Sequence, residues 1–256
     1  MKKSDFLLLL FCLMTVHLSA QPDLDSEKKL FLYGNDSMPY RILLPKNFKP
    51  GKKYPLIIFL HGAGERGNDN EKQLVHGSAL FLNENNYNKY PSIVIFPQCR
   101  KERYWSNMIN EPNMVRSFNF KRTPTKEMKM LLRFIPFVLK AYPVKAKQVY
   151  VGGLSMGGMG VFEIVARKPG FFAAAFPICG GGDTTATKQL ANTSWWIFHG
   201  EKDDVVWPYY SKQMANALIK AGAKVKLSLY PGANHNSWDK AFAEPQLLPW
   251  LFSQHK

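Results

Sequence analysis

Short, almost continuous apolar runs recur along the chain, and several of them end at glycine. The clearest covers residues 55–62, PLIIFLHG, and similar runs follow at 92–98 and 148–155. Strands with this pattern are buried on both faces, as in a parallel sheet covered by helices. Further runs of the series lie at 171–179, 195–200 and 224–232. These runs therefore constrain the chain to a fold built on a largely parallel sheet.

Segments with helical spacing of apolar residues separate these strands. They cover residues 123–142, 156–169, 211–222 and 241–254. Thr125 is a good cap for the first of these helices, and Pro136 is expected to kink or interrupt it. Near the N-terminus, residues 28–33 and 38–45 flank a polar, glycine-containing turn and predict a hairpin. Alternation of strands and helices predicts a single α/β domain with a mostly parallel central sheet flanked by helices.

The first twenty residues have the layout of a secretory signal peptide. Lys2 and Lys3 precede an apolar stretch at 6–16, and a small residue closes the segment. The apolar stretch is too short to span a bilayer comfortably. We therefore expect residues 1–20 to be removed, leaving a single α/β domain over 21–256 with no stable membrane span. The expected location is exported, either periplasmic or extracellular.

Charge and cysteine content exclude several classes of protein. The 256-residue chain has a net charge of +15, but its lysines are scattered and no nucleic-acid-binding motif accompanies them. A solvated basic surface therefore fits better than a nucleic-acid partner. No histidine pair has ligand spacing and no C-x-x-C occurs, so we expect neither a metal nor a cofactor.

A serine stands at the junction of a predicted strand and a predicted helix. Gly153-Leu154-Ser155-Met156-Gly157 follows the apolar run VYVGG, which is the context in which G-x-S-x-G holds a nucleophile. The sharp turn lifts the serine above the strand end, and the small flanking residues let the neighbouring backbone approach. We therefore expect Ser155 to be a nucleophile.

An acid and a histidine follow two later strands. Asp203 and Asp204 compete in the loop HGEKDDVV, and His235 lies in the loop GANHNSWD after the last strand. A histidine there can reach across the strand ends, accept the proton of Ser155 and return it to a leaving group. The order serine, aspartate, histidine is that of α/β-hydrolases and differs from that of chymotrypsin or subtilisin.

Two backbone amides are candidates for stabilising an oxyanion. His61-Gly62-Ala63-Gly64 ends the strand LIIFL, and Met156 directly follows the nucleophile. We assign the N–H groups of Ala63 and Met156 to an oxyanion hole.

Five stretches together resemble the secreted esterase branch of the α/β-hydrolases. This branch includes feruloyl and acetylxylan esterases, poly(3-hydroxybutyrate) depolymerase-like proteins, and sequences of the phospholipase/carboxylesterase or predicted-peptidase type. The resemblance implies that Asp203, the first Asp of H-G-x-x-D-x-x-V, is the acid, and it supports His235. Asp204 departs from the branch, where many members carry proline. The matching stretches are LHGAGERGND, FPQC, GGLSMGG, HGEKDDVV and GANHNSWD.

The chain leaves little room for a lid. Only residues 180–194 separate two late strands, which is too short for a cap domain. An open site suits a bulky ester, such as one on a plant polysaccharide or a phenolic group. Trp105, in the irregular stretch 99–124, and Trp238 are candidate substrate-binding residues. Glu65 and Arg66 either pair with each other or shape the pocket.

The predicted activity is hydrolysis of carboxylic esters by a Ser155–His235–Asp203 triad through an acyl-enzyme. A serine peptidase would use the same residues, and a lipase is less compatible with the missing lid. A polysaccharide-binding protein without catalysis is the alternative from another class. Cys99 and Cys179 follow strands three positions apart in such a sheet, too far for a disulfide, and are expected to be free.

Overall fold

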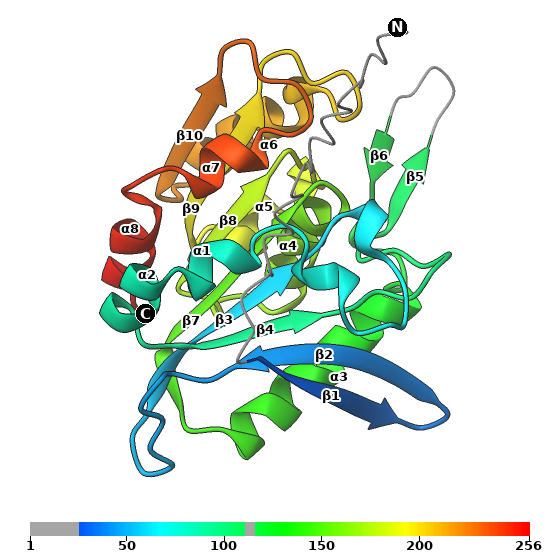
Figure 1. Ribbon diagram of the computed structural model, residues 1–256. Coiled ribbons are helices and arrows are strands. Elements are labelled where there is room, and N and C mark those ends of the chain that lie inside the picture. Colours follow the sequence, from blue (N-terminus) through cyan, green and yellow to red (C-terminus); the bar gives the residue numbers. More distant parts are fainter. Residues whose placement is uncertain (1–25, 111–115) are drawn as a thin grey trace, which may run out of the picture.

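The computed structural model describes residues 26–110 and 116–256. The predicted signal peptide at 1–20 lies outside these residues. Within them, eight strands form one sheet in the order β1-β2-β4-β3-β7-β8-β9-β10 (Figure 1). The strands are β1 (Ser26–Tyr33), β2 (Asp36–Leu43), β3 (Tyr54–Leu60), β4 (Ile93–Pro97), β7 (Val144–Leu154), β8 (Ala174–Ile178), β9 (Ser194–Gly200) and β10 (Val225–Tyr230).

The sheet is mostly parallel, as predicted. From β4 onward each neighbouring pair is parallel, whereas β1 pairs antiparallel with β2 and β2 antiparallel with β4. The hairpin predicted at 28–33 and 38–45 is the β1–β2 pair. The C-terminal ends of the parallel strands therefore share one edge of the sheet, where ligand sites of open α/β sheets gather.

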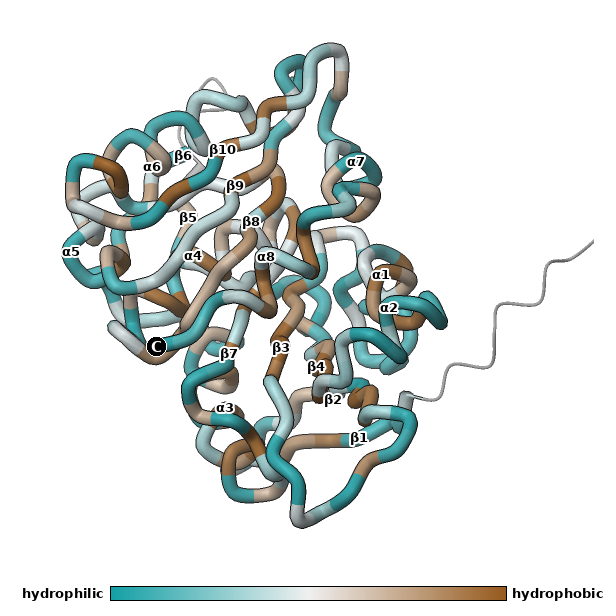
Figure 2. Tube along the Cα trace, turned by 90° about the vertical axis from the view of Figure 1, so that its left-hand side faces the viewer, coloured by the Kyte–Doolittle hydropathy of each residue, from teal (hydrophilic) through white to brown (hydrophobic). Residues whose placement is uncertain are grey.

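Helices cover both faces of the sheet, which explains why its central strands are apolar throughout. Every residue of β3 is buried. Leu56 and Ile58 contribute to the core on one face, and Ile57 and Phe59 to the core on the other. The first core lies under α3 (Lys126–Ala141), α4 (Met156–Arg167) and α6 (Pro208–Lys220). The second lies under α1 (Ser78–Leu82), α7 (Trp238–Phe242) and α8 (Leu247–Ser253). Figure 2 shows α3 and α6 on one side of the strands and α1 and α7 on the other.

Helix α3 begins where the sequence predicts and continues through its proline. The Thr125 hydroxyl accepts a hydrogen bond from the Met128 amide at 3.1 Å, which caps the first turn. The predicted interruption at Pro136 does not occur, and the helix continues to Ala141. Its buried face, which includes Phe134, packs into the first core and offsets the missing backbone donor.

Three local predictions differ from the structure. The helix predicted at 241–254 is divided into α7 and α8, with Pro245 between them. The helices α1 and α2 (Glu84–Lys89) were not predicted. The stretch 99–124 contains an antiparallel hairpin, β5 (Met108–Asn110) and β6 (Arg116–Phe118), rather than irregular chain alone.

The connection between β8 and β9 holds only short elements and no large cap domain. These are the 3-10 turn η4 (Thr184–Ala186) and α5 (Thr187–Leu190). Two further 3-10 turns follow β3, namely η1 (Ala63–Glu65) and η2 (Lys72–Leu74). Within the described residues, no helix combines the length and the apolar character needed to cross a bilayer.

Candidate active site

Ser155 occupies a strained turn between β7 and α4. Its backbone has φ 52° and ψ −117°, which a non-glycine residue rarely adopts. The turn packs closely on the end of β3, because a Cβ atom added at Gly157 would lie 1.9 Å from the carbonyl oxygen of Leu60. Glycine is therefore required two positions after the serine for this approach, and the strained turn holds Ser155 at the strand end.

The structure brings Ser155, His235 and Asp203 into one chain of hydrogen bonds. His235 Nε2 lies 2.9 Å from Ser155 Oγ, and His235 Nδ1 lies 2.8 Å from Asp203 Oδ2. The three side chains come from loops that follow β7, β9 and β10. Along the chain, 80 positions separate Ser155 from His235 and 32 positions separate Asp203 from His235, so only the fold joins them.

Asp203 is held as a buried carboxylate. Its Oδ1 accepts hydrogen bonds from the amides of Val205 and Val206, at 3.0 Å and 2.8 Å. Burial alone would raise the pKa of Asp203, but hydrogen bonds from His199, His235 and the Val206 amide outweigh it and hold that pKa well below its usual range. Asp204 is exposed, and its backbone amide donates to the side-chain oxygen of Asn234 at 3.2 Å. Of the two competing acids, Asp203 is the one that contacts the histidine.

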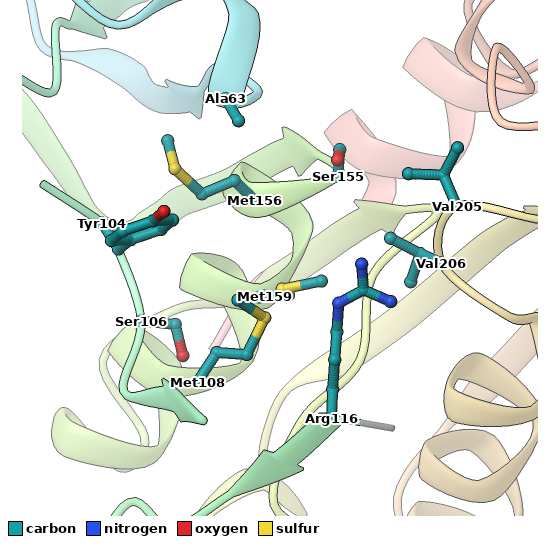
Figure 3. A pocket seen from close by; sticks show the side chains of 10 residues that line it. All are labelled: Ala63, Tyr104, Ser106, Met108, Arg116, Ser155, Met156, Met159, Val205 and Val206. Atoms are coloured by element: carbon teal, nitrogen blue, oxygen red, sulfur yellow. The ribbon is translucent and has the colours of Figure 1, made fainter. Parts of the chain in front are cut away.

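Ala63 and Met156 each begin a helical segment beside the serine. Ala63 is the first residue of η1 and Met156 the first residue of α4, so neither amide has a helical partner. Both residues line the same cavity as Ser155 (Figure 3). The assignment of both amides to an oxyanion hole stays a prediction.

The cavity beside Ser155 has a volume of about 220 Å³. Its walls come from the turn after β3, the 99–124 stretch, α4 and the loop after β9. The lining residues are Ala63, Tyr104, Ser106, Met108, Arg116, Ser155, Met156, Met159, Val205 and Val206. Met159 and Val206 also belong to a small apolar cluster with Tyr210, so one wall of the cavity is a packed surface.

Comparison with known proteins places the chain in a family. A family model described as phospholipase/carboxylesterase matches residues 48–246. The chain belongs to this family. No curated protein matches the chain at a significant level.

Solved structures agree with the α/β-hydrolase fold of the phospholipase/carboxylesterase family. A thermostable esterase superposes with a TM-score of 0.82 at 32% identity, covering 91% of this chain and 64% of that one. This chain thus spans slightly less than two thirds of that esterase. A feruloyl esterase module from Clostridium thermocellum, complexed with sinapinate, gives 0.64 at 17% identity, covering 90% and 88%. A dipeptidyl aminopeptidase IV homologue from Bacteroides ovatus gives 0.66 at 16%, covering 90% and 36%. The last two likenesses concern the fold alone.

The prediction that Trp105 binds substrate is wrong. Its side chain is fully buried, and its indole N–H donates to the His61 carbonyl at 3.1 Å. The neighbouring Tyr104 lines the cavity instead. An aromatic residue in a loop gives no sign in the sequence of whether it faces the site or anchors the loop from beneath.

Trp238 packs against the ring of His235. Its ring is 5.4 Å from that of His235 at 83° and 5.2 Å from that of His76. His76 in turn lies 3.8 Å from a Glu65 carboxylate oxygen. Trp238 therefore braces His235, while a contact with substrate stays a prediction.

Glu65 and Arg66, left open by the sequence, take separate partners. Glu65 faces His76, whereas the Arg66 guanidinium donates to the Ala63 carbonyl at 2.8 Å and lies over the Tyr104 ring. Arg66 thus fixes the turn that carries the Ala63 amide. Glu65 and Arg66 therefore contact different residues around the site and do not form an ion pair with each other.

His199, to which the sequence analysis gives no role, contacts the acid. It is fully buried, with Nε2 2.7 Å from the Val206 carbonyl and 3.2 Å from Asp203 Oδ2. Its Nδ1 lies 2.7 Å from the Ser211 hydroxyl. The position of His199 in the sequence could have indicated this contact, because His199 stands near the end of β9, four residues before Asp203 in the loop that follows.

One grouping within the described ranges has metal-ligating atoms close together. Atoms of Cys179, Asp203 and His235 lie within 4.8 Å of one another. Burial raises the pKa of the Cys179 thiol, so the thiolate needed for a metal is disfavoured. Asp203 and His235 already bond to each other. The donor set therefore fits a hydrogen-bonded triad better than a metal centre.

Proposed function

We propose that this chain is an exported serine hydrolase that cleaves carboxylic esters through an acyl-enzyme on Ser155. The observation that carries the proposal is the continuous Asp203–His235–Ser155 chain of hydrogen bonds. Membership of the phospholipase/carboxylesterase family supports ester hydrolysis as the reaction.

In the proposed first step, Ser155 Oγ attacks the ester carbonyl carbon while His235 Nε2 takes the serine proton. The low pKa of Asp203 keeps its carboxylate charged, so it holds Nδ1–H of His235 and stabilises the imidazolium that forms. His235 then gives the proton to the leaving alcohol, and a water repeats the sequence to release the acid.

The amides of Ala63 and Met156 would stabilise the negative charge that develops on the carbonyl oxygen. Donors of this kind typically contribute about 10²–10³ in turnover each. Their position at the starts of η1 and α4 leaves both N–H groups free for this task and supports the assignment.

The proposed substrates are esters with a bulky alcohol part, such as a carbohydrate. Two observations support this. The connection after β8 carries no cap domain, and His235 is not among the residues that line the cavity beside Ser155. The likeness to a feruloyl esterase module suggests phenolic esters of plant polysaccharides as a class to test.

The test uses p-nitrophenyl butyrate, methyl ferulate and an acetylated xylan with the wild type, Ser155→Ala and Ser253→Ala. Ser253 is exposed near the C-terminus, so its variant controls for loss of a hydroxyl elsewhere. We expect hydrolysis by the wild type and Ser253→Ala and none by Ser155→Ala. Hydrolysis by Ser155→Ala would overturn the proposal, and cleavage of aminoacyl amides faster than esters would favour the peptidase.

A further inference from the structure

Arg116, a half-buried residue at the start of β6, lines the cavity beside Ser155. Its Nε and Nη1 atoms are buried, and neither has a hydrogen-bond partner among the residues that the structure describes. Within the described residues, no carboxylate forms an ion pair with it. Burying guanidinium nitrogens without a partner is costly, so these two atoms are expected to meet an acceptor supplied by a ligand in the cavity.

The backbone of Arg116 is anchored, which fixes the direction of its side chain. Its amide donates to the Tyr210 hydroxyl of α6 at 2.7 Å. Phe118, two positions on in β6, packs edge-on against the same Tyr210 ring at 6.0 Å. Figure 3 shows the side chain rising from β6 toward Val206. The hairpin is therefore docked on α6, and the guanidinium is part of the cavity wall.

The cavity lies on the side of Ser155 that would receive the acyl group. If His235 protonates the leaving alcohol, as the proposed function requires, the alcohol must lie near His235 Nε2. His235 does not line the cavity, whereas Ser155 and both candidate oxyanion residues do. The acyl chain would therefore extend from Ser155 into the cavity, toward Arg116.

The other charges near this wall are already engaged. Glu163 accepts from Ser106 Oγ and from the Asn107 amide, and it pairs with Arg167 at 2.7 Å. Asp203 is bonded to His235. The apolar side chains of Met108, Met159 and Val206 line the space between. A guanidinium in such surroundings binds a carboxylate more strongly than it would in water.

We propose that Arg116 selects acyl groups that carry a second carboxylate, so that the enzyme acts on half-esters of short dicarboxylic acids. A protein cavity of about 150 Å³ holds a benzene molecule, so the cavity of about 220 Å³ suits an acyl group of roughly eight or nine non-hydrogen atoms, the size of a four- or five-carbon diacid. Ser155 forms an ester with the diacyl group while the alcohol leaves with the proton from His235. Water then releases the free diacid, and the second carboxylate stays unchanged.

The test compares monoethyl glutarate with ethyl 5-methylhexanoate, whose isopropyl end has the shape of the carboxylate without its charge. We expect the wild type to favour the charged ester by at least tenfold in kcat/KM. Arg116→Met should lower the ratio of the two kcat/KM values at least tenfold. Lys121→Met removes the same charge from an exposed position near β6 and should leave the ratio unchanged.

Binding of glutarate to the Ser155→Ala protein separates this inference from the proposed function. We expect glutarate to raise the melting temperature of Ser155→Ala and not that of Ser155→Ala/Arg116→Met. A wild-type ratio near one, or a ratio unaltered by Arg116→Met, would overturn the inference while ester hydrolysis stands. Binding that depends on Arg116, without hydrolysis of any ester, would instead overturn the proposed function and keep the subsite.

Discussion

Two adjacent aspartates offer a direct check of the residue that orients His235. Asp203→Asn leaves the shape of the site but removes the charge that holds Nδ1–H of His235, so kcat should fall by about 10³–10⁴. Asp204 is exposed and does not contact the histidine, so Asp204→Asn should change kcat less than about twofold. Both values are measured on p-nitrophenyl butyrate, with circular dichroism to compare folding. A larger loss in Asp204→Asn would contradict the assignment.

The sequence indicates which side chains carry chemistry only where a motif fixes their place. Ser155 and His235 stand in loops that directly follow strands, so their meeting could be anticipated from topology. Trp105 and Arg116 lie in a stretch without such a reference, and their burial depends on contacts with His61 and Tyr210. No pattern near Arg116 distinguishes a cavity-lining arginine from a solvated one.

At the scale of elements, the crossing of β3 and α4 is intolerant of added volume. A methyl group at Gly157 would meet the Leu60 carbonyl oxygen at 1.9 Å, and this oxygen belongs to the backbone of β3, which cannot move aside as a flexible side chain could. Gly157→Ala should therefore lower the free energy of unfolding by about 3 kcal/mol or more. Gly51→Ala is the control, because no atom lies within 4 Å of its added Cβ. Urea unfolding of both proteins checks this, and equal stabilities would contradict the packing described.

The end of β3 also makes the fold sensitive to acid. Burial lowers the pKa of His61 to about 4, while its Nε2 accepts from the Cys99 amide at 2.9 Å. The unfolded chain has a histidine pKa of about 6.5 and takes up the proton first as the pH falls. The free energy of unfolding should therefore drop by about 3 kcal/mol between pH 6.5 and 4.

Urea unfolding at a series of pH values measures this loss. His61→Gln should flatten the dependence, whereas the exposed His255→Gln should not. Because His61→Gln could fold poorly, an NMR titration of the wild-type histidines reports the same pKa directly. A His61 pKa near 6.5 would contradict the prediction.

Elements buried on both faces could be predicted, and those held by tertiary contacts could not. The strands β3 and β4 and the second half of β7, residues 149–154, are apolar and buried because helices cover both of their faces. By contrast, α1 and α2 are short and rely on packing against the sheet and on the Asn83 cap of α2. The β5–β6 hairpin has only three residues in each strand and depends on α6 for its position.

At the scale of the whole molecule, export is the prediction that the first twenty residues carry. When the full chain is produced in a bacterial host, the mature protein should begin at Gln21 and be found outside the cytoplasm. N-terminal sequencing of the fractionated protein measures both. A replacement of Leu8 and Leu9 by aspartate should block export, because it breaks the apolar stretch. Recovery of an unprocessed wild-type chain in the cytoplasm would contradict the prediction.

Cys99 and Cys179 are fully buried and unpaired. The strands they follow, β4 and β8, are separated by β3 and β7. No cross-link contributes to the stability of the described fold, so its maturation requires neither an oxidase nor a disulfide isomerase. Chains that lack residues 1–20 should therefore reach the same fold in a reducing cytoplasm as in an oxidising medium, which makes this hydrolase indifferent to the redox state of its surroundings.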